Sequence, residues 1–172
     1  MLEMPHPDLD HALSNELADV SAVSIDQLRQ WRPLLTSVEE QMSYVRRIAQ
    51  SRSDLVRSEL TERAAGKSRS DLTDIIRRLP EVLAEHGSAD GEAGVAAPDI
   101  DVDPEYSVDL DAVVAPIRLL EVGSFSRGEL RELVMKLEAI EARISVQRRL
   151  VQARADSVEE EIARREDIVV AN

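Results

Sequence analysis

Residues 130–158 read LRELVMKLEAIEARISVQRRLVQARADSV, and every seventh residue of this stretch is Leu, Ile or Val. These apolar positions are Leu130, Leu137, Ile144, Val151 and Val158. A strict seven-residue apolar repeat is typical of a helix that packs along one partner helix in a coiled coil. Ser126 is followed three residues later by Glu129, which is the spacing of an N-terminal capping box. The stretch therefore predicts a long helix from Ser126 to about Arg165.

A second stretch predicts the partner helix. Ser37 and Glu40 also have capping-box spacing, and no Pro or Gly follows until Gly66. An apolar seam interrupted by Arg52 runs along this helix at three- and four-residue steps and contains Val38, Met42, Val45, Ala49 and Val56. The connection between the helices is long enough for either orientation, and dimerisation of the whole chain would also cover both seams.

The N-terminal part of the chain carries weaker signals. Residues 1–23 have no sustained apolar period and predict a mobile tail or one weak helix. A short helix is expected from Ser24 to Trp31, because Ser24 has capping-box spacing to Gln27. Pro33 is expected to end this helix.

The predicted organisation has three further segments. Residues 24–86 contain the short helix, the first long helix and an accessory amphipathic helix after Ser70. Residues 87–116 form a predicted flexible acidic linker, in which 87–111 carry eight carboxylates and no basic residue. Residues 117–172 contain the second long helix. The fold class is therefore all-α, with a long two-helix coiled coil, short accessory helices and a disordered linker.

Composition limits the function classes. The chain has 172 residues, 2% aromatic residues, no Cys and a net charge of -13. The negative charge disfavours direct DNA binding, since the phosphate backbone would be repelled. The absence of Cys and of a long apolar run predicts a cytoplasmic chain that binds no membrane.

The two long helices share a polar repeat. An offset of 102 residues aligns EEQMSYVRRIAQSRSD (39–54) with EARISVQRRLVQARAD (141–156), and seven of the sixteen positions are identical. Both copies obey the pattern E-x3-S-x2-R-x3-Q-x3-D. On a helix these offsets place all five side chains within a sector of roughly 80°. A structural coiled coil would preserve apolar positions, whereas this repeat preserves polar ones.

The repeated side chains suit a ligand with two equivalent halves. A carboxylate accepts hydrogen bonds from guanine N1 and N2, and an Arg fork suits guanine O6 and N7 or a phosphate. For one copy alone, a solvated helix face with intrahelical Glu and Arg pairs would be the simpler interpretation. Two matched copies favour a binding site, and because the motifs must face each other they favour an antiparallel hairpin.

The pattern resembles the signature of the RsiG-type anti-sigma factors of actinobacteria, which occurs once on each of two antiparallel helices. The resemblance implies that the chain sequesters a WhiG-type sigma factor, of the flagellar and sporulation class, when it is bound to cyclic di-GMP. It implies a ligand bound as a dimer, a 1:1 complex with the sigma factor and no metal. The implied ligand-binding residues are Glu39, Ser43, Arg46, Gln50, Asp54, Glu141, Ser145, Arg148, Gln152 and Asp156, with Arg47 and Arg149 bordering them as further candidates.

Two other function classes are an enzyme and a ligand-independent adaptor. Catalysis is disfavoured because the three His residues are scattered without metal-ligand spacing, and two exposed helices offer no desolvated site for acid and base chemistry. A ligand-independent coiled-coil adaptor or scaffold remains the alternative, because the heptads alone would support it.

Overall fold

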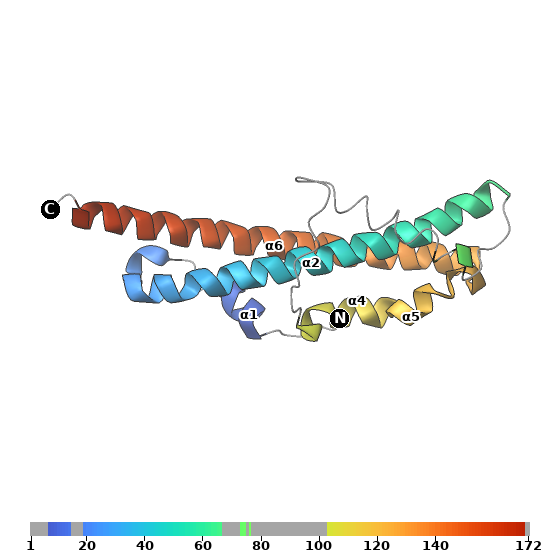
Figure 1. Ribbon diagram of the computed structural model, residues 1–172, viewed down its shortest axis with the longest axis horizontal. Coiled ribbons are helices and arrows are strands. Elements are labelled where there is room, and N and C mark those ends of the chain that lie inside the picture. Colours follow the sequence, from blue (N-terminus) through green and yellow to red (C-terminus); the bar gives the residue numbers. More distant parts are fainter. Residues whose placement is uncertain (1–6, 15–18, 67–72, 75, 77–102, 171–172) are drawn as a thin grey trace. The chain divides into compact units, whose positions relative to one another are not determined.

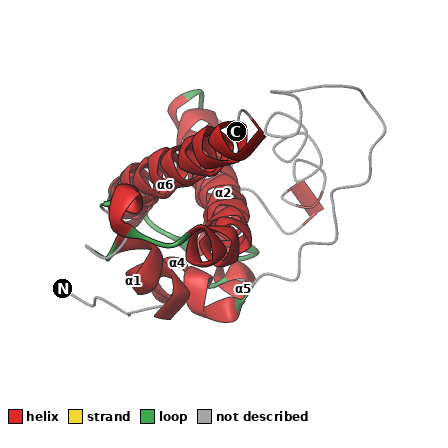
Figure 2. Cartoon of the chain, turned by 90° about the vertical axis from the view of Figure 1, so that its left-hand side faces the viewer, coloured by secondary structure: helices red, strands yellow, loops and turns green. Residues whose placement is uncertain are grey.

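Two long helices dominate the fold. The computed structural model describes residues 7–14, 19–66, 73–74, 76 and 103–170. Helices α2 (Ile25–Ala64) and α6 (Arg127–Val170) contain most of them. Figure 2 shows helices joined by loops, and no strand occurs in the described residues. The all-α prediction is confirmed.

Short helices precede each long helix. Before α2 lie α1 (Pro7–Leu13) and the 3-10 turn η2 (Val20–Ala22). Before α6 lie η3 (Pro104–Ser107), α4 (Val108–Val113), α5 (Pro116–Leu119) and η4 (Val122–Ser124). Figure 1 labels the two long helices, α2 and α6, and the short helices α1, α4 and α5.

The chain folds as two compact units, and each unit takes one part of each long helix. Unit 1 consists of Met1–Tyr44 and Ile144–Asn172, and unit 2 consists of Val45–Arg143. Unit 1 therefore contains the start of α2 and the end of α6. Unit 2 contains the end of α2 and the start of α6.

In unit 1 the two helix segments are antiparallel. Arg29 is 2.8 Å from Glu166, and Arg148 is 2.8 Å from Glu39, so residue numbers rise along α2 as they fall along α6. The apolar side chains of both segments are buried between them and include Leu28, Leu35, Val38, Met42, Ile144, Val151 and Val158. Removing this aliphatic surface from water stabilises the pair by roughly 25 cal/mol per Å².

Unit 2 repeats this arrangement. Arg46 lies 3.6 Å from Glu141, and Arg57 pairs with Glu138 farther along α2, which again gives antiparallel segments. The buried apolar residues along these two segments include Val45, Ala49, Val56, Leu130 and Leu137. The predicted seams and the antiparallel pairing are thus confirmed in both units.

The predicted break between a short helix and the first long helix is wrong. Pro33 lies inside α2, and so does Ser37, which was expected to start the long helix. A proline costs one helical hydrogen bond and strains the preceding turn. Here the apolar face continues on both sides of it through Trp31 and Leu35, both buried, while the Pro33 ring is exposed. Packing of the seam therefore outweighs the local preference to stop.

The predicted start of α6 and the predicted end of α2 are confirmed, whereas α6 continues to Val170, beyond its predicted end near Arg165. The Ser126 hydroxyl accepts from the Glu129 amide at 3.2 Å, and the Glu129 carboxylate accepts from the Ser126 amide at 2.6 Å. These two bonds form the predicted capping box. At the end of α2, Gly66 has a φ of 80°, a left-handed conformation that glycine adopts without steric cost.

The prediction of a flexible acidic linker is wrong from residue 103 onward. Its C-terminal part forms η3 and α4, and Leu110 and Val114 are buried. These apolar side chains outweigh the acidic composition around them. Residues 87–102 lie outside the described residues. So does most of the predicted accessory helix, of which residues 73, 74 and 76 are described and are helical.

The N-terminal segment also contains more structure than a mobile tail. Over residues 1–23 the sequence allowed a tail or one weak helix, and the structure forms α1 and η2 there. Ala12 at the end of α1 is fully buried. Residues 1–6 and 15–18 lie outside the described part of the chain.

The offset of 102 residues relates far more of the chain than the sixteen-residue motif. It aligns η2 (Val20–Ala22) with η4 (Val122–Ser124), and it aligns the first residue of α2, Ile25, with that of α6, Arg127. The buried pairs that it relates include Ala12 with Val114, Leu28 with Leu130, and Leu35 with Leu137. Each long helix with its preceding short helices is therefore one copy of an internal duplication, and each unit combines the first part of one copy with the last part of the other.

Equivalent arginines attach a short helix in each unit. In unit 2, the buried Arg52 donates to the Val114 carbonyl at 2.8 Å and pairs with Asp111 at 2.6 Å, which holds the end of α4. In unit 1, Arg154 donates to the Ala12 carbonyl at the end of α1. Both arginines turn away from the motif face, and both cap the last carbonyls of a short helix.

Removing either arginine is expected to release one short helix. A helix of six or seven residues is marginal without tertiary contacts, and a hydrogen bond from a charged group contributes about 1.5–3 kcal/mol. Arg52→Ala should raise amide hydrogen exchange in α4 by at least about tenfold, and Arg154→Ala should do the same in α1. Arg47→Ala and Arg149→Ala, which change exposed arginines, serve as controls. Equal exchange in all four variants would contradict this role.

A second pair of equivalent arginines, Arg63 in unit 2 and Arg165 in unit 1, binds the turn that precedes a long helix. Arg63 donates to the carbonyls of Phe125 at 2.6 Å and Gly123 at 2.9 Å, and its Nε donates to Glu59 at 2.6 Å. Both Arg63 and Glu59 are buried. The guanidinium therefore satisfies carbonyls of the turn before α6 and neutralises an otherwise costly buried carboxylate.

Arg165 makes the same set of contacts in unit 1. It donates to the carbonyls of Val23 at 2.6 Å and Ser21 at 3.0 Å, and its Nε donates to Glu161 at 2.6 Å. Hydrogen bonds from Arg164 and then Arg165 lower the pKa of Glu161 to about 2. Because folding lowers this pKa, the ionised carboxylate stabilises unit 1 at pH values above its ordinary pKa of 4.5. The contribution is lost as the pH falls toward 2.

Candidate functional site

The structure distributes the motif residues between the two units. Unit 1 contains two residues from the first copy and four from the second, namely Glu39, Ser43, Ser145, Arg148, Gln152 and Asp156. Unit 2 contains the other three residues of the first copy and the first residue of the second, namely Arg46, Gln50, Asp54 and Glu141. In both units the Glu of one copy is therefore grouped with the Arg, Gln and Asp of the other.

In unit 1 the motif glutamate lies between the two helices. Arg148 on α6 donates to Glu39 Oε1 at 2.8 Å, and Ser43 on α2 donates to the same oxygen at 2.8 Å. Gln152 and Asp156 follow Arg148 at one-turn steps on α6 and are exposed. We call Glu39, Arg148, Gln152 and Asp156 the unit 1 half-site.

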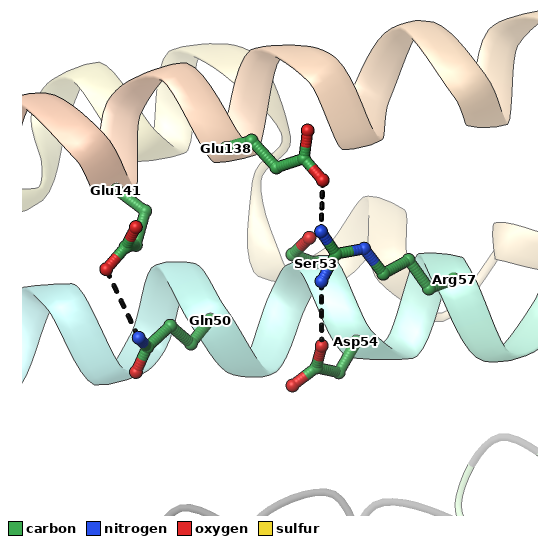
Figure 3. Close-up of a pocket in the computed structure, with 6 residues that line it drawn as sticks. All are labelled: Gln50, Ser53, Asp54, Arg57, Glu138 and Glu141. Atoms are coloured by element: carbon green, nitrogen blue, oxygen red, sulfur yellow. Dashed lines mark hydrogen bonds and ion pairs between the residues drawn. The ribbon is translucent and has the colours of Figure 1, made fainter.

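In unit 2 the same kinds of residue meet with the helices exchanged. Arg46 on α2 lies 3.6 Å from Glu141 Oε1 on α6, and Gln50 donates to this oxygen at 3.2 Å (Figure 3). We call Glu141, Arg46, Gln50 and Asp54 the unit 2 half-site. The cross-helix Glu and Arg pair occurs in both units, so the two copies face each other as the repeated motif predicts.

Burial leaves these pairs partly open to solvent. The side chains of Glu39 and Glu141 are each 27% exposed, and those of Arg148 and Arg46 are 25% and 31% exposed. The two Glu and Arg pairs thus have nearly the same accessibility, whereas the motif Gln and Asp side chains are exposed in unit 1 and half-buried in unit 2.

Both motif arginines keep an unsatisfied donor. The Nε atoms of Arg46 and Arg148 are buried, and among the described residues neither finds an acceptor. Leaving a buried donor unpaired costs about 1–3 kcal/mol. A phosphate oxygen or guanine O6 would supply the missing acceptor, so the donor sets of both half-sites fit a guanine nucleotide.

A cavity of about 280 Å³ lies in the unit 2 half-site. Its lining contains three motif residues and three others, and the full set is Gln50, Ser53, Asp54, Arg57, Glu138 and Glu141 (Figure 3). The volume is just below the usual range for ligand pockets, about 300–1,000 Å³. It could accommodate a part of a ligand, such as one base, with the remainder outside.

Sequence reasoning missed Ser53, Arg57 and Glu138. Arg57 lies three residues after Asp54, and Glu138 lies three residues before Glu141, so each extends a motif face by one turn. Their opposite charges at facing ends of the two motifs were a usable signal. The second-copy equivalents do not repeat these residues, however, and a search for repeated residues therefore passes over them.

The bordering arginines lie outside these cross-helix pairs. Arg47 and Arg149 are both exposed, and Arg149 Nε donates to the Ser145 carbonyl one turn earlier. No cluster of three or more His, Asp or Glu side chains among the described residues could hold a metal ion. Within the same residues, no helix is long and apolar enough to cross a bilayer.

Comparison with known proteins identifies the family. A search of curated proteins returns no match. A model of the RsiG-like family matches residues 14–83 and 118–171, which include both motif copies and the whole of both long helices. The match follows the duplicated helices and omits the segment between them. The chain therefore belongs to the RsiG-like family.

Proposed function

We propose that the chain is an anti-sigma factor that sequesters a WhiG-type sigma factor when it carries cyclic di-GMP. The RsiG-like family implies the anti-sigma role, and hence a regulatory function with a sigma factor as partner. The dependence on the nucleotide rests on one observation. Both half-sites present a cross-helix Glu and Arg pair whose Arg Nε is buried and finds no acceptor in the part of the chain that the structure describes.

The proposed ligand contacts divide by chemistry. Arg46 and Arg148 bind guanine O6 and N7 or phosphate oxygens, because their forks present parallel donors. Asp54 and Asp156 accept from guanine N1 and N2, because an ionised carboxylate offers acceptors alone. Two half-sites of the same composition suit two copies of one ligand, as expected for cyclic di-GMP bound as a dimer.

Net charge supports a joint complex of protein, ligand and partner. The chain has a net charge of -13, and the ligand phosphates are also negative. Arginines offset this repulsion locally, and a basic promoter-binding surface on the sigma factor would offset it further. The half-sites are partly exposed, so a partner that covers them would strengthen every charged contact by excluding water.

Linkage then requires that ligand and sigma factor tighten each other by the same factor. At low nucleotide concentration the sigma factor is free to engage RNA polymerase. At high concentration it is held by the loaded anti-sigma factor.

Capture of a WhiG-type sigma factor over a range of cyclic di-GMP concentrations tests the proposal. We expect capture by the wild-type chain to rise at least tenfold with nucleotide, and Asp156→Ala to shift the midpoint to at least tenfold higher concentration, since a charged hydrogen bond contributes about 1.5–3 kcal/mol. Glu160→Ala is the matched control, because Glu160 is an exposed carboxylate one turn farther along α6.

Two outcomes would contradict the proposal. Capture that is equally strong without nucleotide would leave a constitutive anti-sigma factor. No capture under any condition, with no heat of nucleotide binding, would favour the ligand-independent adaptor.

A further inference from the structure

The two half-sites match in their motif residues but differ in their neighbours. Around the unit 2 half-site lie Ser53, Arg57 and Glu138. The offset of 102 residues places Ala155, Glu159 and Thr36 at the equivalent positions in unit 1. The duplication thus preserves the motif while the residues that border it have diverged.

The largest difference concerns the charge beside the motif aspartate. In unit 2, Arg57 Nη1 lies 3.4 Å from Asp54 Oδ1, and Arg57 also pairs with Glu138 on the facing helix (Figure 3). In unit 1, the residue three positions after Asp156 is the exposed Glu159. Residues three apart on a helix are neighbours. Asp54 therefore has a cation beside it, and Asp156 has a second carboxylate.

A second difference concerns a hydroxyl group. Ser53 is 5% exposed, and its Oγ has no hydrogen-bond partner among the described residues although the residue lines the cavity. Its counterpart Ala155 carries no polar side chain. Unit 2 thus has an unsatisfied hydroxyl in the cavity wall, in addition to the cation.

We propose that Arg57 makes the unit 2 half-site the tighter of the two for cyclic di-GMP, so that unit 2 is loaded first. Arg57 orients the Asp54 carboxylate and adds a cation for a ligand phosphate or guanine O6, and Ser53 supplies a further polar contact. In unit 1, Glu159 repels the ligand phosphates instead. The inference rests on the proposed function, because it concerns the same ligand.

Unequal loading has a regulatory consequence. The half-sites fill at different nucleotide concentrations, so the fully loaded form appears only above the weaker of the two dissociation constants. Sequestration that requires full loading would then be governed by unit 1, while unit 2 retains its ligand at lower concentrations.

Reciprocal exchange of the bordering residues tests the inference. Calorimetric titration of the full chain with cyclic di-GMP, with and without the sigma factor, should show two steps whose dissociation constants differ at least tenfold. Arg57→Glu should weaken the tighter step at least tenfold, because it replaces a charged contact with a repulsive one. The double variant Thr36→Glu, Glu159→Arg carries the two charged bordering residues of unit 2 in unit 1, and it should tighten the weaker step by a similar factor.

A control variant separates ligand contact from support of the helix pair. Glu138→Gln removes the cross-helix ion pair but leaves the Arg57 cation, so it should weaken the tighter step far less than Arg57→Glu does. Helicity measured by circular dichroism should be the same in all variants.

The outcomes distinguish this inference from the proposed function. Two equal steps in the wild type, or a tighter step unaffected by Arg57→Glu, would overturn the inference alone. Loss of the tighter step in Glu138→Gln to the same extent as in Arg57→Glu would assign Arg57 to helix pairing and would also overturn it. Absence of binding in the wild type, with and without the sigma factor, would overturn both.

Discussion

The double variant Arg46→Ala, Arg148→Ala should bind cyclic di-GMP at least a hundredfold more weakly than the wild type. Each arginine contributes a charged contact of about 1.5–3 kcal/mol, and each tenfold in affinity corresponds to about 1.4 kcal/mol. Each arginine pairs with a different glutamate, Arg46 with Glu141 and Arg148 with Glu39, so their effects should be close to additive. Calorimetry with the full chain measures the change directly.

Two companion variants distinguish the loss of motif contacts from a change in net charge and from a loss of folding. Arg47→Ala, Arg149→Ala removes the same charge from exposed neighbours and should change affinity far less. Arg46→Lys, Arg148→Lys retains a cation beside each motif glutamate but has no fork, so it should give intermediate affinity with normal helicity. Binding that survives in the double alanine variant would refute a role for the motif arginines.

Arg63→Ala should be the most destabilising single change among the charged residues that we consider. It removes a charged donor from the buried Glu59 and from three carbonyls near the start of α6, those of Val122, Gly123 and Phe125. Breaking a buried pair on one side costs about 3–5 kcal/mol. For a chain of this size the melting temperature should fall by about 10 °C.

Thermal unfolding followed by circular dichroism provides the measurement. Arg164→Ala is the control, because Arg164 is 58% exposed and pairs with Glu161 within one helix turn. Arg63→Lys should restore little stability, since a lysine cannot reach the carboxylate and several carbonyls with one rigid group. A melting temperature for Arg63→Ala equal to that of Arg164→Ala would show that the contacts of Arg63 contribute little.

Patterns with strict spacing were predictable from the sequence. The heptads of α6, the seam of α2 and the capping box at Ser126 all describe helix faces or ends, and the structure contains them where the spacing predicts. The facing of the two motifs followed from their identity and was found as the cross-helix Glu and Arg pairs. Such features depend on residue type and periodicity alone.

Features that depend on tertiary contacts were not predictable. Pro33 signals a helix end locally, but the buried side chains around it continue α2. The acidic residues after 103 suggest a linker, although Leu110 and Val114 anchor this segment. The contacts of Arg52 and Arg63 are largely to backbone carbonyls, which carry no residue identity for a sequence comparison to find. Identities that extend the duplication, such as Glu59 with Glu161 and Arg63 with Arg165, are present in the sequence, but the role they share became visible only through their equivalent contacts.

Each unit combines the first part of one copy with the last part of the other, and this arrangement also predicts an order of folding. Contacts of Arg63 that close unit 2 join residues 59 to 62 positions apart, whereas those of Arg165 in unit 1 join residues 142 to 145 positions apart. Longer loops cost more entropy to close, and prior closure of unit 2 shortens the loop that unit 1 must close. During synthesis, unit 2 has all its residues once Arg143 is added, while unit 1 awaits Ile144–Asn172. Helix α1, which is synthesised first, is thus expected to dock among the last.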